Sequence, residues 1–213
     1  MYKKIIFFIG GLFFSCSIFA QGNKNAVDSL KEVEKNNIAI TTLSADFIQT
    51  KHLSLFQEPI VSRGKIYLKK PGLFAWRSTS PIKYNMVIKG MAIAQWDEDS
   101  KALQKISLNS NPAFSTAIDQ MKLWFYGDYA KLSDNYEISV TSENPLTFKF
   151  VPHQDFFTAK VIDSMSVVFN SEKSYLKKIS IAEKSGDTME IDFSAVTINP
   201  KLGEKVWEAA SAV

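Results

Sequence analysis

The chain has 213 residues, of which 46% are hydrophobic and 13% aromatic, which is enough apolar material for one domain with a substantial core. Its formal charge at pH 7 is only +3, and no long block of lysine and arginine is present, so the composition gives little electrostatic attraction to nucleic acid. The single cysteine, Cys16, excludes a scaffold held together by disulfides.

The N-terminal segment has the pattern of an export signal. Lys3 and Lys4 precede an apolar run over residues 5–14, and Ala20 supplies the small residue of a cleavage site. The run is too short for a comfortable membrane span. We therefore predict a cleaved signal over residues 1–20 and a single domain over 21–213, whose charge falls from +3 to +1 without the two lysines. The alternatives are a transmembrane anchor and lipidation of Cys16 after cleavage before it, and either would attach the protein to a membrane.

The first half of the predicted domain combines one helix with a series of strands. Ala26, Val27, Leu30 and Val33 recur at helical spacing and predict a short amphipathic helix over 26–36. From residue 42 apolar residues recur at every second position, as in β-strands. The boundaries between the predicted strands fall at residues that favour turns. The predicted strands cover 42–51, 60–69, 73–79, 82–89, 91–96 and 102–108.

The second half begins with another helix and returns to strands. Pro112 suits the first turn of this helix, and Gly127 ends it. Strands are predicted at 136–142, 146–152, 161–169, 175–184 and 188–198. A short C-terminal helix is expected near 203–210.

Eleven short strands with hairpin-length turns favour a strongly curved antiparallel sheet or barrel with added helices, in the α+β class. Several strands alternate cleanly, as where Leu146, Phe148 and Phe150 are separated by Thr147 and Lys149. Such a sheet has one solvent-exposed face and one buried, apolar face. The two amphipathic helices are the only long segments that could cover the apolar face.

The sequence offers little for catalysis. His52 and His153 lie far apart with no neighbouring ligand residues, and the acidic turn 97–99 lacks the spaced oxygen ligands of a calcium loop. No nucleophile elbow and no phosphate-binding loop is present. We therefore predict no metal site, and the residues argue against a hydrolytic enzyme.

The most informative stretch is Gly64–Trp76, GKIYLKKPGLFAW, which predicts a β-hairpin with an aromatic face. Pro71 presets φ for the corner, and Gly72 accepts the positive φ that such a turn often requires. Phe74 and Trp76 are two apart and therefore share a face. From the residues alone, that face is either ordinary core or the wall of an apolar cavity.

Several segments together resemble one known family. They are Ala45–Gln49, Gly64–Trp76, Lys89-Gly90 followed by Trp96, Pro112, and Phe193–Pro200. In this order they resemble the periplasmic outer-membrane lipoprotein carrier proteins, the LolA family. The resemblance implies an unclosed β-barrel with a helical lid over its concave apolar face. It also implies a protein that is not an enzyme and has no cofactor.

The resemblance also implies a function and partners. The expected role is a monomeric periplasmic carrier of acylated lipoproteins, served by an inner-membrane ABC transporter and an outer-membrane acceptor, with no nucleic-acid partner. A carrier of another lipid or amphiphile remains an alternative, as does a membrane-anchored acceptor or lipid-sensing module if Cys16 is lipidated.

Site residues follow from the apolar faces that the lid would cover. The family pattern places an arginine before the corner proline, where it bonds to the lid, and Lys70 occupies that position here as the candidate latch. The lid faces are expected at Leu30, Val33, Phe114, Ile118 and Met121. The cavity wall is expected at Phe47, Phe74, Trp76, Met86, Ile88, Trp96, Phe148, Phe150, Met165, Met189, Ile191 and Phe193.

Overall fold

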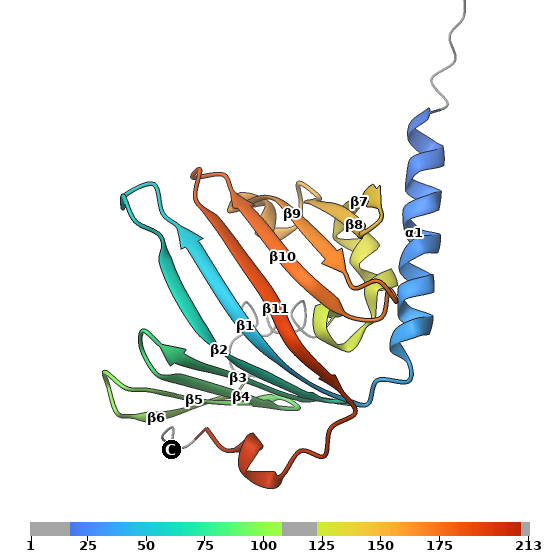
Figure 1. Ribbon diagram of the computed structural model, residues 1–213. Coiled ribbons are helices and arrows are strands. Elements are labelled where there is room, and N and C mark those ends of the chain that lie inside the picture. Colours follow the sequence, from blue (N-terminus) through green and yellow to red (C-terminus); the bar gives the residue numbers. More distant parts are fainter. Residues whose placement is uncertain (1–17, 108–122, 210–213) are drawn as a thin grey trace, which may run out of the picture.

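Eleven strands form one antiparallel sheet whose two ends do not meet (Figure 1). The computed structural model describes residues 18–107 and 123–209. The sheet order is β6-β5-β4-β3-β2-β1-β11-β10-β9-β8-β7, which confirms the predicted unclosed barrel. The strands are β1 (Thr42–His52), β2 (Ile60–Lys69), β3 (Leu73–Ser80), β4 (Tyr84–Lys89), β5 (Ala92–Asp97), β6 (Leu103–Ser107), β7 (Tyr136–Glu143), β8 (Leu146–Pro152), β9 (Ile162–Phe169), β10 (Leu176–Glu183) and β11 (Thr188–Ile198).

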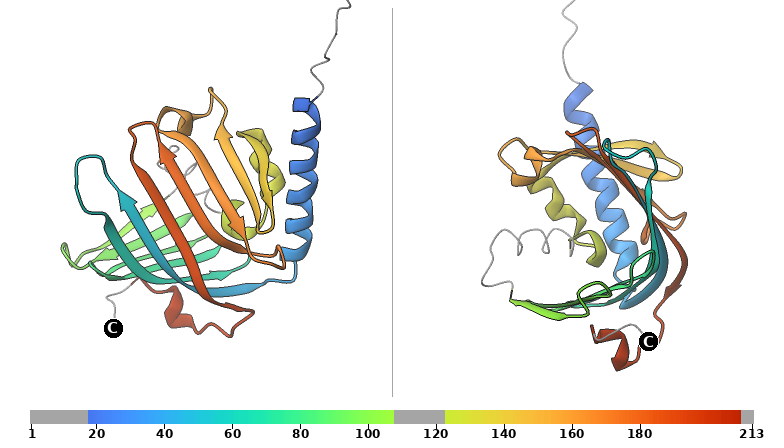
Figure 2. Two further views of the ribbon diagram at one scale, coloured as in Figure 1. Left: turned by 45° about the horizontal axis from the view of Figure 1, so that its top comes forward. Right: turned by 90° about the vertical axis from the view of Figure 1, so that its left-hand side faces the viewer.

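Helical segments occupy the concave side of this sheet (Figure 2). They are α1 (Ile18–Asn37), the helical residues 123–126 and the 3₁₀ turn η2 (Tyr129–Asp134), while η3 (Phe157–Lys160) lies at the end of the sheet where β9 begins. A further 3₁₀ turn, η4 (Glu204–Trp207), lies on the convex side. No helix in the described part of the chain is long and apolar enough to cross a membrane.

The hairpin predicted at the Lys-Pro-Gly corner is present. β2 pairs with β3 from Lys69 opposite Leu73 to Gly64 opposite Ser78, and Gly72 adopts the positive φ of 89° that its turn requires. Gly64 is a close-approach position, because a Cβ atom there would lie 1.8 Å from the backbone oxygen of Arg77. The sequence motif is thus explained by chain geometry at both glycines.

The core lies between the concave face and the helices. Leu30 and Val33 of α1 are fully buried, as is Leu132 of η2, and all three belong to the same apolar cluster as the strands. On the convex side, Trp207 packs on Ala75 and Val87 in a second, smaller cluster. The concave side therefore holds most of the buried apolar surface that stabilises the fold.

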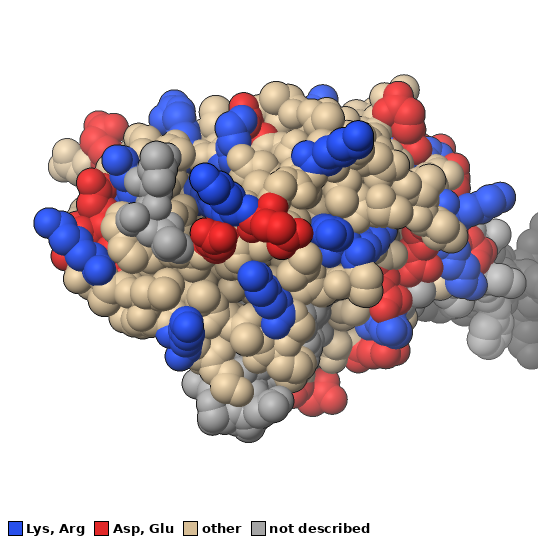
Figure 3. Space-filling model, turned by 90° about the horizontal axis from the view of Figure 1, so that it is seen from below, with Lys and Arg blue, Asp and Glu red and all other residues tan. Residues whose placement is uncertain are grey.

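The C-terminal segment is held against the convex face by one arginine. Arg77 donates from Nη2 to the backbone oxygens of Lys205 at 2.9 Å and Val206 at 3.0 Å. Basic and acidic side chains are interspersed over this underside of the molecule (Figure 3).

Helical segments differ most from the sequence expectations. α1 begins at Ile18, whereas the apolar spacing marked only residues 26–36. The expected C-terminal helix is the single 3₁₀ turn η4, and neither η2 nor η3 was predicted. Segments of four to six residues are too short to show a helical period.

Candidate lipid-binding cavity

Aromatic rings form the floor of the concave face. Phe47 of β1 and Trp76 of β3 have ring centroids 4.0 Å apart, and Phe74 lies 6.5 Å from Trp76. Phe125, at the end of the second helical segment, packs 4.9 Å from Phe74 and 5.8 Å from Phe193 of β11. This helical segment therefore lies on the aromatic floor and joins strands from both halves of the sheet.

Beside these rings lies a cavity of about 310 Å³. Every described side chain that lines it is uncharged, and most are fully apolar. Burial raises the pKa of the neighbouring Tyr126 phenol to about 12, so this phenol stays neutral at physiological pH. The cavity is lined by Trp76, Trp124, Phe125, Tyr136, Phe157, Thr158, Ile162, Met165, Ile179, Ile181 and Ile191.

Most of the predicted wall residues lie together on this concave face. Only Trp76, Met165 and Ile191 line the cavity itself. Trp76, Met86 and Met189 are partly buried against the main core cluster, whereas the other wall residues, apart from Trp96, are buried within it. The buried wall residues are Phe47, Phe74, Ile88, Phe148, Phe150, Met165, Ile191 and Phe193.

The expected position of Trp96 is wrong. Trp96 pairs with Asn85, and Asn85 pairs with Arg77, whose side chain reaches the convex segment η4. Directly paired residues share a face, so Trp96 lies on the convex side. Ile93 and Trp96 are three residues apart, and only Ile93 belongs to the concave core. A hollow of about 700 Å³ lies on that outer side, between Val87, Leu103 and Trp207.

The remaining lid predictions divide into two groups. Leu30 and Val33 are placed as expected, on the buried face of α1. Phe114, Ile118 and Met121 lie outside the described residues. Sequence reasoning missed Phe157 and the isoleucines at 179 and 181, although the alternation of the last two in β10 is the same signal that identified the other strands.

Lys70 contacts the C-terminal end of α1. Its Nζ donates to the backbone oxygen of Asn37 at 3.1 Å and also to the side-chain oxygen of Asn37. Burial lowers the pKa of the Lys70 ammonium below its usual value. A cation at the C-terminus of a helix satisfies carbonyl groups that have no partner within the helix.

Asn37 connects this lysine to two further segments. It is only 4% exposed, and its Nδ2 donates to the backbone oxygen of Ser174 at 2.6 Å. A Cβ atom added to Gly127 would lie 2.3 Å from the Asn37 side-chain oxygen, so the end of the second helical segment is also packed on it. One asparagine therefore holds the β2–β3 corner, the β9–β10 turn and both helical segments together.

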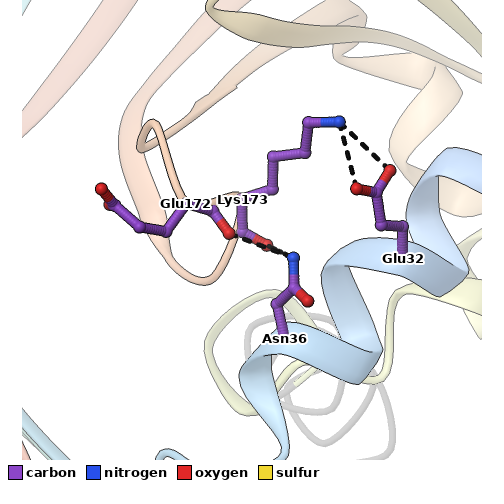
Figure 4. A network of polar contacts seen from close by, with 4 residues as sticks. All are labelled: Glu32, Asn36, Glu172 and Lys173. Atoms are coloured by element: carbon purple, nitrogen blue, oxygen red, sulfur yellow. Dashed lines mark hydrogen bonds and ion pairs between the residues drawn. The ribbon is translucent and has the colours of Figure 1, made fainter.

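A second set of polar contacts involves Glu32 and Asn36 in the last turns of α1 (Figure 4). Asn36 donates from Nδ2 to the backbone oxygen of Glu172 at 3.0 Å, and Lys173 forms an ion pair with Glu32 at 3.1 Å. Both contacts join the last turns of α1 to the β9–β10 turn. They lie at the surface, so the ion pair contributes less than about 1 kcal/mol.

Comparison with known proteins identifies this architecture. The family model described as outer membrane lipoprotein carrier protein LolA matches residues 39–209, from just before β1 to beyond η4. The chain belongs to the LolA family.

Individual members of the LolA family are distant in sequence. An outer-membrane lipoprotein carrier protein of Hahella chejuensis is 24% identical over 195 residues, which cover 87% of this chain and 84% of that protein. An outer-membrane lipoprotein carrier protein of Coxiella burnetii is 22% identical over 211 residues, which cover 97% of this chain and 92% of that protein.

Solved structures show the same fold at still lower identity. An uncharacterised conserved protein of Thermus thermophilus is 12% identical with a TM-score of 0.53, covering 86% of this chain and 92% of that one. The Pseudomonas aeruginosa MucA/MucB complex contains a chain 11% identical with a TM-score of 0.53, covering 87% of this chain and 61% of that one.

Proposed function

We propose that this protein is a periplasmic carrier that holds the acyl chains of lipoproteins and delivers them to the outer membrane. The observation that carries the proposal is the cavity of about 310 Å³ between the sheet and the helical segments, with no charged side chain among its described lining residues. Membership of the LolA family supports it. The carrier performs no catalysis and uses no cofactor.

The size of the cavity indicates that the helices move during loading. Sites for small organic ligands have volumes of about 300–1,000 Å³, so this cavity lies at the lower limit. Burying an acyl chain of about 16 carbons releases about 12 kcal/mol, and several chains release more. A carrier with that full affinity would not release its cargo. Packing the helices into the empty cavity opposes loading and brings the net affinity into a range that permits transfer.

Delivery requires partners on both membranes. As in the family, we propose an inner-membrane ABC transporter that supplies the lipoprotein and an outer-membrane acceptor that receives it, with the carrier acting as a monomer. Export by the segment 1–20 places the chain in the periplasm.

Site-specific photocrosslinking tests the cargo site, because the chain offers two tryptophans on opposite faces of one sheet, in the strands β3 and β5. A photoreactive phenylalanine analogue in place of Trp76 should capture the acyl chains of lipoproteins released from the inner membrane. The same analogue in place of Trp96, on the convex face, is the matched control and should capture none. Equal capture at both positions, or none at Trp76, would contradict the proposal. Native mass spectrometry of the periplasmic protein would reveal a different amphiphile.

The contact between Lys70 and Asn37 is expected to stabilise the closed position of the helices. Lys70→Met leaves the buried Asn37 oxygen without this donor and should lower the free energy of unfolding by about 1–3 kcal/mol. It should also raise the affinity for a fluorescent acyl probe, because closing competes less with loading. Urea unfolding and probe titration measure the two effects.

Lys70→Arg is the matched control for this contact. It keeps a donor and the charge at the helix end, so its stability and probe affinity should remain nearer to those of the unmodified chain. A methionine variant with unchanged stability and unchanged probe affinity would show that the contact does not hold the helices.

A further inference from the structure

The β1–β2 turn exposes apolar side chains to an unusual degree. Leu55 is 90% exposed and Phe56 61% exposed, and Leu55 has the highest exposed fraction among the large hydrophobic residues that the structure describes. Ile60, at the start of β2, is 44% exposed. Single exposed leucines are ordinary, but a group of three at the end of one protruding hairpin needs a reason.

This turn has a defined conformation. The Phe56 N–H donates to the backbone oxygen of Leu53 at 2.9 Å. The Ser54 N–H donates to Oδ1 of Asp187 in the β10–β11 turn at 2.8 Å, and this hydrogen bond lowers the pKa of the Asp187 carboxyl. The two apolar side chains are therefore held outward on a turn that is braced against its neighbour.

Further apolar side chains continue from this turn toward the cavity. The Lys184 N–H donates to the backbone oxygen of Val161 at 2.8 Å, which links the β10–β11 turn to the start of β9. Val161 is 55% exposed and Phe157 43% exposed, and Phe157 also lines the cavity. Figures 1 and 2 place the two hairpin turns and η3 at the same end of the sheet.

We propose that the tip formed by Leu55, Phe56 and Ile60 inserts into the surface of a lipid membrane. The choice of a lipid membrane as the occupant rests on the proposed function, because a carrier that collects cargo at one membrane and delivers it at another must approach both surfaces. The exposed apolar residues also lead from the cavity to the tip. A stable protein interface needs about 800 Å² from each partner, whereas a few side chains on a protruding turn suit shallow insertion.

The small number of charged residues around the tip indicates that its contact with the membrane is apolar rather than electrostatic. Residues 53–60 contain one charged side chain, Glu58, and the adjacent Lys51 lies 3.9 Å from Glu183. No excess of basic residues is therefore available to attract anionic headgroups. Binding should be similar on neutral and anionic vesicles and should change little with salt.

Vesicle flotation tests the proposal with residues 21–213, the chain that remains after the proposed signal is cleaved. The unmodified protein should float with phosphatidylcholine vesicles, and equally with vesicles that also contain phosphatidylglycerol. The double variant Leu55→Asp, Phe56→Asp should partition about tenfold less or worse. Leu103→Asp, at a residue 49% exposed on the edge strand β6, is the matched control and should float normally.

A fluorescent label checks insertion directly. Residues 21–213 contain no cysteine, so the variant Leu55→Cys gives one labelling site in this chain. An environment-sensitive dye there should brighten and shift to shorter wavelength on adding vesicles, and the same dye at Leu103→Cys should not. Equal responses at both positions would overturn the proposal.

Binding of a fluorescent acyl probe without vesicles separates this proposal from the proposed function. Probe binding without flotation would overturn membrane docking and leave the carrier function intact. Absence of probe binding would contradict the carrier function instead. Analytical ultracentrifugation could instead show that the unmodified protein is a dimer and the tip variant a monomer. That result would also overturn membrane docking, because a second copy of the chain would then cover the tip.

Discussion

Replacing Gly64 with alanine is expected to destabilise the fold by about 3 kcal/mol or more. The added Cβ would lie 1.8 Å from the backbone oxygen of Arg77 and 2.8 Å from Cε1 of Phe47. The first contact is with backbone, which cannot rotate away, so β2 and β3 must separate. The second pushes on Phe47, whose ring packs 4.0 Å from that of Trp76, so the aromatic floor is displaced as well.

Gly203→Ala is the control for this effect. No atom lies within 4 Å of a Cβ built on Gly203, and its φ of −74° is acceptable to alanine. Chemical denaturation should therefore show a large decrease in the free energy of unfolding for Gly64→Ala and almost no change for Gly203→Ala. Equal stabilities would mean that the β2–β3 spacing adjusts freely, and the close approach would then not explain the glycine.

Replacing Ile181 with lysine is expected to reduce acyl-probe affinity about 100-fold or more, because a charge in an apolar cavity has no partner. Ile181 lines the cavity opposite Met165 in the β9–β10 pair. Ser180→Lys is the matched control on the other face of the same strand, where the new charge lies opposite Glu190. Fluorescence titration should show near-normal binding for this control.

A second substitution covers the case in which Ile181→Lys fails to fold. Ile181→Trp keeps the position apolar but fills part of the cavity of about 310 Å³. It should lower probe affinity while retaining cooperative unfolding. Unchanged affinity in a folded Ile181→Trp chain would show that acyl chains bind elsewhere.

The sheet could be predicted from sequence because each strand carries its own local signal. Strict alternation of apolar and polar residues, as around Leu146, Phe148 and Phe150, predicted the strands. Turn residues such as Pro71 and Gly72 predicted where the strands end. All eleven predicted strands correspond to observed ones. The unclosed shape followed only from the family resemblance, since alternation alone does not distinguish an open sheet from a closed barrel.

The arrangement around the cavity could not be predicted in the same way. Trp96 was assigned to the wrong face because β5 carries apolar residues on both sides, and the convex side is apolar where η4 covers Ala75 and Val87. The role of Asn37 depends on contacts with Lys70 and Ser174, which lie 33 and 137 residues away. No local pattern marks such contacts.

The centre of the sheet has a consequence for the order of assembly. The strands β1 and β11 are paired there, with Leu43 opposite Ile198, although they come from opposite ends of the chain. Each half can form hairpins by itself, but the seam between the halves needs β11, which the ribosome produces after the other ten described strands. Pairing between such distant segments is also the slow step in folding. The sheet therefore stays divided into two separate halves until β11 has been synthesised.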